Sequence, residues 1–357
     1  SGMALQAFAG SETDVEAVCD DQCKIFLVLT QGETADETEK ESQKGQGMNN
    51  RIWFHADDFG VTREQSARIL ECYDNGVLNS ISVLPNTGAL KESLRLLDQA
   101  DPDHGRIRRV LHINFVEGKP LAGARNVPAL VDSTGRFDKS FIRMFLWNYL
   151  KRGAARQRLA GQLRQEIAAQ LRAVTAENDY HITAIDSHQH YHMIPIVFDS
   201  LMEVLSSEEF GHLGIRHIRI PVDPAVPLMH NARMRRGVPA MNWVKWGILK
   251  IFQKRNHKLL KSRGIETPVF FGMFYTCEMK REVVEALLPA YRHYADRRGE
   301  ELELMFHPGN LTAPHELLDE RSRQLADFYM SDNRYYEAEC LKGIKHSAIV
   351  RNTDRLE

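Results

Sequence analysis

The chain has 357 residues, of which 43% are hydrophobic and 26% are charged, the composition of an ordinary soluble globular protein. This composition excludes a collagen-like chain, a disulfide scaffold and a wholly disordered chain. With 46 basic and 48 acidic side chains the formal net charge is −2, which argues against a general nucleic-acid binder.

The first 50 residues differ in kind from the rest. They carry ten acidic and three basic side chains, a net charge of −7, whereas residues 51–357 carry a net charge of +5. Residues 31–50 have almost no large apolar side chains and cannot bury enough surface to offset their ordering entropy. The helical-looking stretch 11–29 is too short to form a domain. We therefore expect a poorly ordered acidic tail or linker at 1–50 and a single domain at 51–357.

The cysteines and the apolar segments indicate the compartment. Five cysteines without CxxC spacing are typical of free thiols in a reducing environment. No apolar run approaches the roughly 18 residues that span a membrane. The run at 25–29 is too short for a signal-peptide core and lacks a basic flank. We expect a cytoplasmic protein without a transmembrane segment.

From residue 51, short apolar segments typical of strands alternate with segments of helical periodicity. Strands are predicted at 51–55, 80–84, 110–115, 182–187, 215–221, 269–274 and 302–307, with a last candidate at 345–350. Helices are predicted at 63–75, 88–98, 157–178, 195–206, 242–263, 280–298 and 314–330. This alternation indicates a parallel sheet of βαβ units. The simplest α/β fold with about seven such strands is a distorted (β/α) barrel.

Two long stretches interrupt this alternation. Residues 117–150 follow the third predicted strand and residues 222–241 follow the fifth, and both are rich in glycine or proline. They leave the carboxyl ends of strands, where barrels place their active-site loops. Because long loops in a compact domain are usually functional, we expect both to shape a binding site.

Two adjacent carboxylates, Asp57 and Asp58, follow the first predicted strand. Near a buried sheet edge such a pair needs a cation or hydrogen-bond donors. A turn in which Asp58 caps the next helix explains the pair about equally well.

Histidines stand at the ends of the third and seventh predicted strands. His112 and Asn114 share one face of an extended strand, although a single strand histidine is more often packed in a core. His307 precedes Pro308 and Gly309, which force a sharp turn just past its ring. A histidine that merely packs under this turn is the alternative.

The strongest local signal follows the fourth predicted strand. His188, His190 and His192 alternate there and would point to one side of an extended segment. Asp186 is placed to orient one ring that binds a metal. The alternative, a surface histidine cluster, is less consistent with the apolar strand that precedes the run.

The four strand ends would open on the same face of a barrel. One aspartate with two histidines is a common open site for a divalent metal, with positions left for water and substrate. A second carboxylate can take a proton from the bound water, and a further histidine can protonate a leaving group. The residues therefore predict a metal-assisted hydrolase.

Four motifs, which follow one another along the chain at predicted strand ends, resemble the motifs of one family. HADDFG at 55–60, LHINFVEGKPL at 111–121, IDSHQHYHMIP at 185–195 and FHPG at 306–309 resemble the YdjC/ChbG-like carbohydrate deacetylases over about residues 51–350. The resemblance implies a distorted barrel, related in mechanism to polysaccharide deacetylases. It implies removal of N-acetyl groups from amino sugars such as chitooligosaccharides.

By motif match the resemblance also implies site roles. One divalent metal would be held by Asp58, His112 and His188, with Asp57 as general base and His307 as general acid. The adjacent carboxylates could exchange roles. The family is associated with Mg²⁺, whereas two imidazoles and one carboxylate suit Zn²⁺ at least as well, so both metals stay open.

Further side chains are candidates for contact with the acetylated amino-sugar substrate. The predicted substrate-binding residues are Asn114, His190, His192, Arg219 and Trp147. Core or inter-loop packing is the simpler explanation for each of the side chains that could stack on sugar rings, namely Arg143, Trp147, Tyr149, Trp243 and Trp246. A basic stripe runs along the helix predicted at 242–263 and consists of Lys245, Lys250, Lys254, Lys258 and Lys261. A solvated helix face explains this stripe. The alternative is a surface that attracts an anionic glycan, a lipid-linked sugar or a membrane.

Two other functions stay open. A phosphoesterase or amidohydrolase commonly places its HxH on the first strand and needs ligands for two metals, whereas here HQH ends the fourth. A non-catalytic glycan-binding barrel would have lost site residues that are all present. The sequence leaves open which amino sugar is bound (a chitooligosaccharide, a peptidoglycan fragment, an acetylated glycolipid or a hopanoid-linked sugar) and whether the protein is a homodimer.

Overall fold

The computed structural model describes residues 14–19, 25–30, 51–176, 181–313 and 323–344. The chain divides into two compact units, Ser1–Met48 and Asn49–Glu357. In the first unit, β1 (Asp14–Cys19) pairs with β2 (Ile25–Thr30) as an antiparallel hairpin. The helical character expected for 11–29 is therefore wrong, because these segments are rich in the β-branched and aromatic residues that favour strands.

The second unit is built on seven parallel strands. These are β3 (Ile52–Phe59), β4 (Ser80–Val83), β5 (Arg108–Ile113), β6 (Ala184–Ser187), β7 (His217–Ile218), β8 (Val269–Phe271) and β9 (Leu302–Phe306). Their order is β7-β6-β5-β4-β3-β9-β8, and every neighbouring pair is parallel. A bridge between His217 and Glu266 joins β7 to the chain that enters β8. The strands thus follow one another around a ring, and the predicted distorted (β/α) barrel is confirmed.

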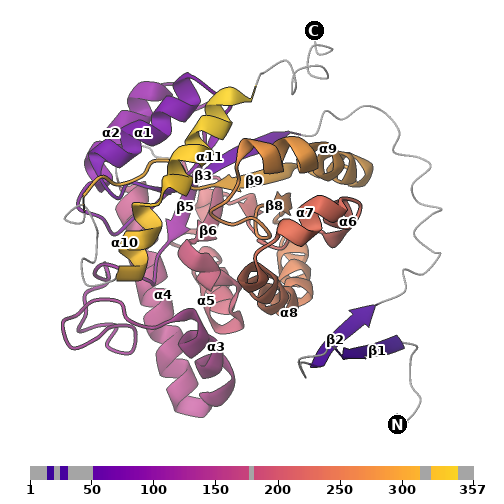
Figure 1. The fold of residues 1–357 in the computed structure, drawn as a ribbon. Coiled ribbons are helices and arrows are strands. Elements are labelled where there is room, and N and C mark those ends of the chain that lie inside the picture. Colours follow the sequence, from indigo (N-terminus) through magenta and orange to yellow (C-terminus); the bar gives the residue numbers. More distant parts are fainter. Residues whose placement is uncertain (1–13, 20–24, 31–50, 177–180, 314–322, 345–357) are drawn as a thin grey trace. The chain divides into compact units, whose positions relative to one another are not determined.

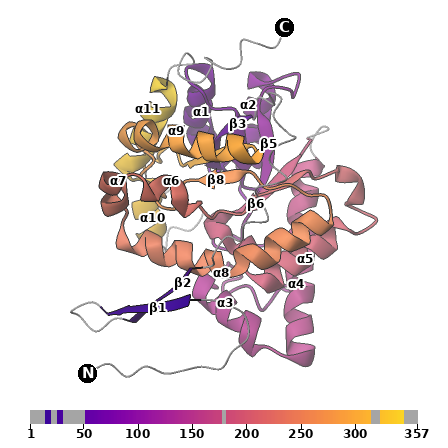
Figure 2. The ribbon, with the colours of Figure 1, turned by 90° about the vertical axis from the view of Figure 1, so that its right-hand side faces the viewer.

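Helices surround this sheet, as Figures 1 and 2 show. The predicted helices are present as α1 (Arg63–Asp74), α2 (Leu90–Ala100), α4 (Gly153–Thr175), α5 (Pro195–Leu205), α8 (Ala240–Ser262), α9 (Arg281–Arg298) and α10 (Arg323–Tyr329). The first part of the helix predicted at 314–330 and the candidate strand at 345–350 lie outside the described residues. Among the described helices, none is long and apolar enough to cross a membrane.

Both long stretches contain helices that the sequence analysis did not predict. The stretch after β5 includes α3 (Phe141–Leu150), and the stretch after β7 includes α6 (Ala225–Met229) and α7 (Ala232–Gly237). A further unpredicted helix, α11 (Asp332–Gly343), packs against α1 and α9. The long connections leave the carboxyl ends of β5 and β7, as expected.

The core lies between the sheet and the helices. On α4, Leu163, Ile167 and Leu171 are fully buried because a spacing of four residues places them on one helix face. On α9, Tyr291 stacks on Phe271 of β8 with 4.1 Å between ring centroids. Such packing fixes the strands whose ends carry the polar side chains.

The strand β3 continues past its predicted end at residue 55. Asp57 and Asp58 therefore lie within the strand, where the register to β4 shifts. Asp58 has a φ of 66°, a conformation that is uncommon outside glycine and clusters at functional sites. The cap of α1 is Thr62, whose Oγ1 accepts the N–H of Gln65 at 3.0 Å. The alternative in which Asp58 caps this helix is wrong.

Candidate active site

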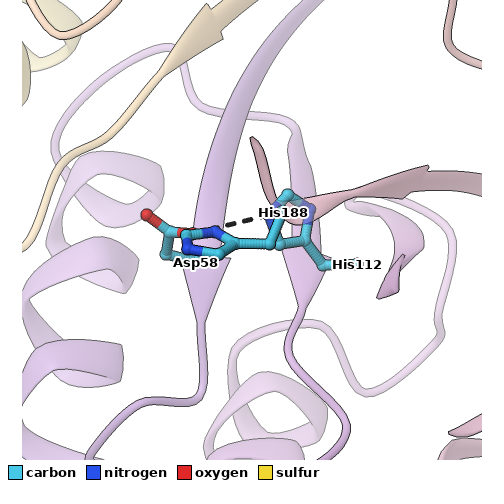
Figure 3. Close-up of side chains that lie close together, drawn as sticks. All are labelled: Asp58, His112 and His188. Atoms are coloured by element: carbon cyan, nitrogen blue, oxygen red, sulfur yellow. Dashed lines mark ion pairs between the residues drawn. The ribbon is translucent and has the colours of Figure 1, made fainter. Parts of the chain in front are cut away.

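Three side chains from different strands meet at the carboxyl ends of the barrel strands. Asp58 of β3, His112 of β5 and His188, which directly follows β6, each offer one ligating atom, and these atoms lie within 4.8 Å of one another. Figure 3 shows the three side chains close together. Asp58 Oδ1 lies 2.8 Å from His188 Nδ1 and 3.4 Å from His112 Nε2. We call these residues the Asp58 cluster.

The Asp58 cluster fits a divalent cation. All three side chains are buried, and buried polar atoms normally have partners. Among the described residues, Asp58 Oδ1 and His188 Nε2 make no hydrogen bond of proper geometry, although Oδ1 is in ion-pair contact with His188 Nδ1. Two imidazole nitrogens and one carboxylate oxygen are a donor set used for divalent metals.

Asp186 of β6 orients His112. Its Oδ1 lies 2.7 Å from His112 Nδ1, and its Oδ2 accepts a hydrogen bond from Ser82 at 2.5 Å. A carboxylate that fixes one ring nitrogen while the other faces the metal is the usual support of a metal-binding histidine. Burial alone would lower the pKa of His112, but the charges of Asp186 and Asp57 raise it to about 10.

Arg334 of α11 holds the other oxygen of Asp58. Its guanidinium pairs with Asp58 Oδ2 and also donates to the carbonyls of Pro308 and Gly309 at 3.4 Å. Burial would raise the pKa of Asp58, but His188, His112 and Arg334 together lower it well below its ordinary value. The carboxylate is therefore ionised, with Oδ1 directed at the two histidines.

Asp57 is held by a different arginine. Arg219, just past β7, donates to both oxygens of Asp57 at 2.9 Å, and His55 Nε2 lies 3.0 Å from Oδ1. Burial would raise the pKa of Asp57, but Arg219 and His112 lower it well below its ordinary value. His307 Nε2 lies 3.8 Å from Asp57 Oδ2. The structure thus brings both predicted proton-transfer groups beside the Asp58 cluster.

A row of ion pairs continues from Asp57 through the barrel interior. Arg219 also binds Asp186 at 2.8 Å and Glu303 of β9 at 2.5 Å, and Glu303 pairs with Arg108 of β5. Arg219 is therefore committed to carboxylates, and it positions Asp57 rather than presenting its guanidinium to a substrate. Sequence reasoning missed Glu303 and Arg108, because nothing in an apolar strand pattern identifies their partners.

A second cluster of ligating atoms is formed by His55, Asp57 and Asp186, within 4.8 Å of one another. The guanidinium of Arg219 contacts both of its carboxylates. A cation already pairs with these oxygens, so electrostatics disfavour a second metal beside the first. The second cluster is therefore a poorer candidate for a metal than the Asp58 cluster.

Glu337 of α11 fixes the turn that carries His307. Its carboxylate accepts the backbone N–H of His307 and, at 2.9 Å, the backbone N–H of Met279. The His307 ring packs edge-on to Phe328, with 5.5 Å between centroids. Glu337 and Arg334 were missed by sequence reasoning, because no helix was predicted at 332–343 and the partners of both residues come from distant segments.

The histidines after β6 do not alternate along an extended strand. Residues His188–Met193 form a 3₁₀ turn in which Gln189 and His190 have positive φ, so the prediction that three rings share one side is wrong. His192 is fully buried, with Nδ1 2.6 Å from the Ser187 hydroxyl and Nε2 2.7 Å from the Arg219 carbonyl. These contacts leave neither nitrogen free for a substrate.

His190 stays close to the charged groups of the site. Burial lowers its pKa well below the ordinary value. The charges of Arg219, His192 and His307 act in the same direction, and the charge of Asp57 opposes them. Its Nδ1 has no hydrogen-bond partner among the described residues. His190 is thus a neutral imidazole with a free nitrogen, which suits the predicted substrate contact.

Asn114 builds the turn after β5. Its side chain donates to Asn86 at 2.9 Å and accepts the N–H of Val116 at 2.8 Å, so it is occupied within the protein. This turn brings the buried side chain of Glu117 close to His188. Sequence reasoning missed this residue. Glu117 Oε1 accepts the Tyr329 hydroxyl at 2.5 Å and lies 3.4 Å from His188 Nε2.

The aromatic candidates are spread over the molecule. Trp147 of α3 has Lys151 over its ring at 4.5 Å, and no contact between described residues joins it to the Asp58 cluster. Trp243 and Trp246 pack on Phe274 at 4.6 and 5.3 Å, which confirms the packing explanation. The five lysines of the basic stripe are exposed on α8.

The fold and the site together define an α/β barrel with a buried carboxylate–histidine cluster at the carboxyl ends of its strands. The model of the YdjC-like protein family matches residues 51–350. The chain belongs to this family, as its motifs suggested.

Relatives are named for deacetylation. The chain is 38% identical over 87 residues to a carbohydrate deacetylase of Thermoanaerobacter pseudethanolicus, covering 24% of this chain and 33% of the relative. It is 26% identical over 267 residues to a chitooligosaccharide deacetylase of Serratia marcescens, covering 74% and 84%. The matches span between 33% and 58% of the first three curated relatives.

One solved structure shares the fold. It is an Enterococcus faecalis protein named for cellobiose-phosphate cleavage, with a TM-score of 0.57 and 18% identity. The similarity covers 85% of this chain and 94% of that one. It supports the architecture alone.

Proposed function

We propose that this protein is a metal-dependent hydrolase that removes N-acetyl groups from amino sugars. The observation that carries the proposal is the Asp58 cluster lying beside an arginine-held Asp57 at the carboxyl ends of the strands. The relatives named as carbohydrate and chitooligosaccharide deacetylases support the same reaction. The substrate class is therefore an acetylated amino sugar in an oligosaccharide or glycoconjugate.

In the proposed mechanism Asp58, His112 and His188 would hold one divalent ion. When bound there, such an ion would polarise the acetyl carbonyl and lower the pKa of a water molecule. Asp57 takes the proton of the attacking water as general base. Arg219 keeps this carboxylate ionised and fixes the direction of its oxygens.

The leaving amine needs a proton when the amide bond breaks. His307 is the proposed donor, because its Nε2 lies 3.8 Å from Asp57 and its backbone is fixed by Glu337. A proton taken by Asp57 has only a short distance to travel to this ring. The two residues can therefore act as the base and acid of one turnover.

The metal and the cellular setting are part of the proposal. Mg²⁺ follows from the family and Zn²⁺ from the two imidazole donors. Cys72, Cys277 and Cys340 are free thiols, which supports a reducing cytoplasmic setting. Metal analysis of protein purified in buffers that contain Mg²⁺ or Zn²⁺ would show which of the two ions the protein retains.

Acetate release from acetylated chitooligosaccharides tests the proposal. We expect Asp58→Ala to lose metal and nearly all activity. We expect Asp57→Asn to keep the metal and lose roughly 10²- to 10⁴-fold in kcat, the usual loss of a general base. Asp296→Asn, on the exposed face of α9, is the matched control and should behave as wild type.

Three outcomes would contradict this proposal. Activity near wild type in either site variant would remove the assigned roles. Two equivalents of metal per chain would favour the phosphoesterase or amidohydrolase alternative instead. Glycan binding without acetate release by the fully metallated protein would point to the non-catalytic barrel.

A further inference from the structure

A cavity lies at the opposite end of the barrel from the Asp58 cluster. Its volume is about 560 Å³, and its lining comes from the residues at or just before the amino ends of β3 to β7 and β9. The lining contains five arginines and three histidines against a single carboxylate, Glu301. The arginines are Arg51, Arg106, Arg108, Arg109 and Arg216. We call this space the basal cavity.

The carboxylates near the basal cavity do not balance its five arginines. Glu301 accepts the indole N–H of Trp53 at 2.6 Å and lies 3.4 Å from His217. Arg109 is bound by Asp98 at 2.6 Å. No ion pair between described residues joins the exposed side chains of Arg51, Arg106 and Arg216 to a carboxylate. These three arginines outnumber Glu301, so the cavity carries a net positive charge.

Arg108 gives the basal cavity a buried donor. Its side chain is held on three sides, by Glu303, by the Ser80 hydroxyl at 2.9 Å and by the ring of Trp53 at 4.3 Å. The residue is only 7% exposed, yet its Nη1 has no hydrogen-bond partner among the described residues. A buried, unpaired N–H of a cation is unfavourable unless an anion completes it.

We propose that the basal cavity binds a small molecule that carries a phosphate group. Converging guanidinium groups match the geometry of phosphate oxygens, which they bind with paired N–H donors. The volume exceeds the needs of a free phosphate ion and falls within the range of small-molecule pockets, about 300–1,000 Å³. The ligand is therefore a phosphate monoester whose polar remainder fills the cavity. The deacetylase proposal does not use this end of the barrel, so a test that refutes one of the two proposals leaves the other unchanged.

Calorimetric titration of the full-length, EDTA-treated protein tests this site. The probes are glucose 6-phosphate, inorganic phosphate and glucose, at matched ionic strength. We expect glucose 6-phosphate to bind, inorganic phosphate to bind more weakly and glucose to give no heat of binding. Arg51→Gln and Arg216→Gln should each weaken glucose 6-phosphate binding by roughly tenfold, the effect of losing one charge-assisted contact.

The control variant is Arg236→Gln, an exposed arginine on α7. It should bind glucose 6-phosphate as wild type does, and urea unfolding should show all three variants folded. The proposal is overturned if glucose 6-phosphate and glucose give the same heat. It is equally overturned if Arg51→Gln and Arg216→Gln retain wild-type affinity, because binding would then lie elsewhere.

Discussion

Asp186 shows how much one buried carboxylate supports in this site. It orients His112 through Nδ1, accepts a hydrogen bond from Ser82 and pairs with Arg219. Burial would raise the pKa of Asp186, but Arg219 and His112 lower it well below its ordinary value. The residue therefore connects the proposed metal ligands with the arginine that holds Asp57.

We expect Asp186→Asn to lower metal affinity by about 10- to 100-fold, the usual effect of removing the partner of a metal-binding histidine. The neutral amide no longer favours the His112 ring orientation in which Nε2 faces Asp58. Asp223→Asn is the matched control, since Asp223 is equally buried but accepts backbone N–H groups of Gly272 and Phe274. Titration with Zn²⁺ measures both. Equal losses in the two variants would refute a specific role for Asp186.

At the scale of elements, the turn after β9 is fixed by its contact with α1. Gly309 has a φ of 78°, and a Cβ there would lie 2.8 Å from Ile69 Cγ1 and 3.0 Å from the Gln65 carbonyl. The turn therefore needs glycine for both its conformation and its packing. The same turn positions His307, so packing and proposed proton transfer depend on one residue.

We expect Gly309→Ala to lower the free energy of unfolding by roughly 2–4 kcal/mol, from backbone strain plus overpacking. Gly264→Ala separates the two causes, because Gly264 also has a positive φ of 67° but a Cβ there meets no atom within 4 Å. That control should lose about 1–2 kcal/mol. Urea unfolding measures both variants. Indistinguishable midpoints would show that the contact with α1 does not contribute.

At the scale of the whole molecule, the barrel interior is held partly by charge. Barrel interiors are usually filled with layers of branched apolar side chains. Here Glu303 lies between Arg219 and Arg108 inside the sheet. Burial would raise the pKa of Glu303, but the two arginines lower it to about 2, from an ordinary value of 4.5. This carboxylate therefore stabilises the fold while it is ionised.

The sign of this effect gives a pH dependence. Because the pKa of Glu303 is lower in the folded protein, its contribution is complete above about pH 4.5 and is lost as the pH falls toward 2. We expect Glu303→Gln to lower the free energy of unfolding by roughly 3–5 kcal/mol at pH 7, with a smaller difference at pH 3. The exposed Glu282→Gln should follow wild type at both values. A difference that does not change with pH would contradict the ion-pair explanation.

The barrel was predictable from the sequence because short apolar segments typical of strands alternate with segments in which apolar residues recur at helical spacing. The helices at 63–75 and 280–298 were found within a few residues of α1 and α9, since their buried positions recur every three to four residues. The helix α11 was missed. Its buried residues include Arg334 and Glu337, so its inner face is partly charged and does not show an apolar period.

The sequence predicted the residues of the candidate site about as fully as it predicted the fold. The sequence places Asp58, His112 and His188 at strand ends, and the structure brings them together. It also placed Asp186 to orient one histidine, and Asp186 Oδ1 lies 2.7 Å from His112 Nδ1. It could not show Arg334 and Glu117, because these residues arrive from distant segments through tertiary packing. The alternating spacing of His188, His190 and His192 predicted an extended segment, and this prediction was wrong. Gln189 and His190 have positive φ, so the segment forms a tight turn.

The charged interior also limits how this barrel can vary in sequence. Loss of Arg108, Glu303 or Arg219 alone would leave an opposite charge buried without its partner. Replacement of Arg108 and Glu303 together by apolar side chains would remove both charges at once, so the double change should destabilise less than the sum of the single changes. Substitutions along this row are therefore non-additive. Related barrels are expected to keep or exchange these positions as a set rather than one by one.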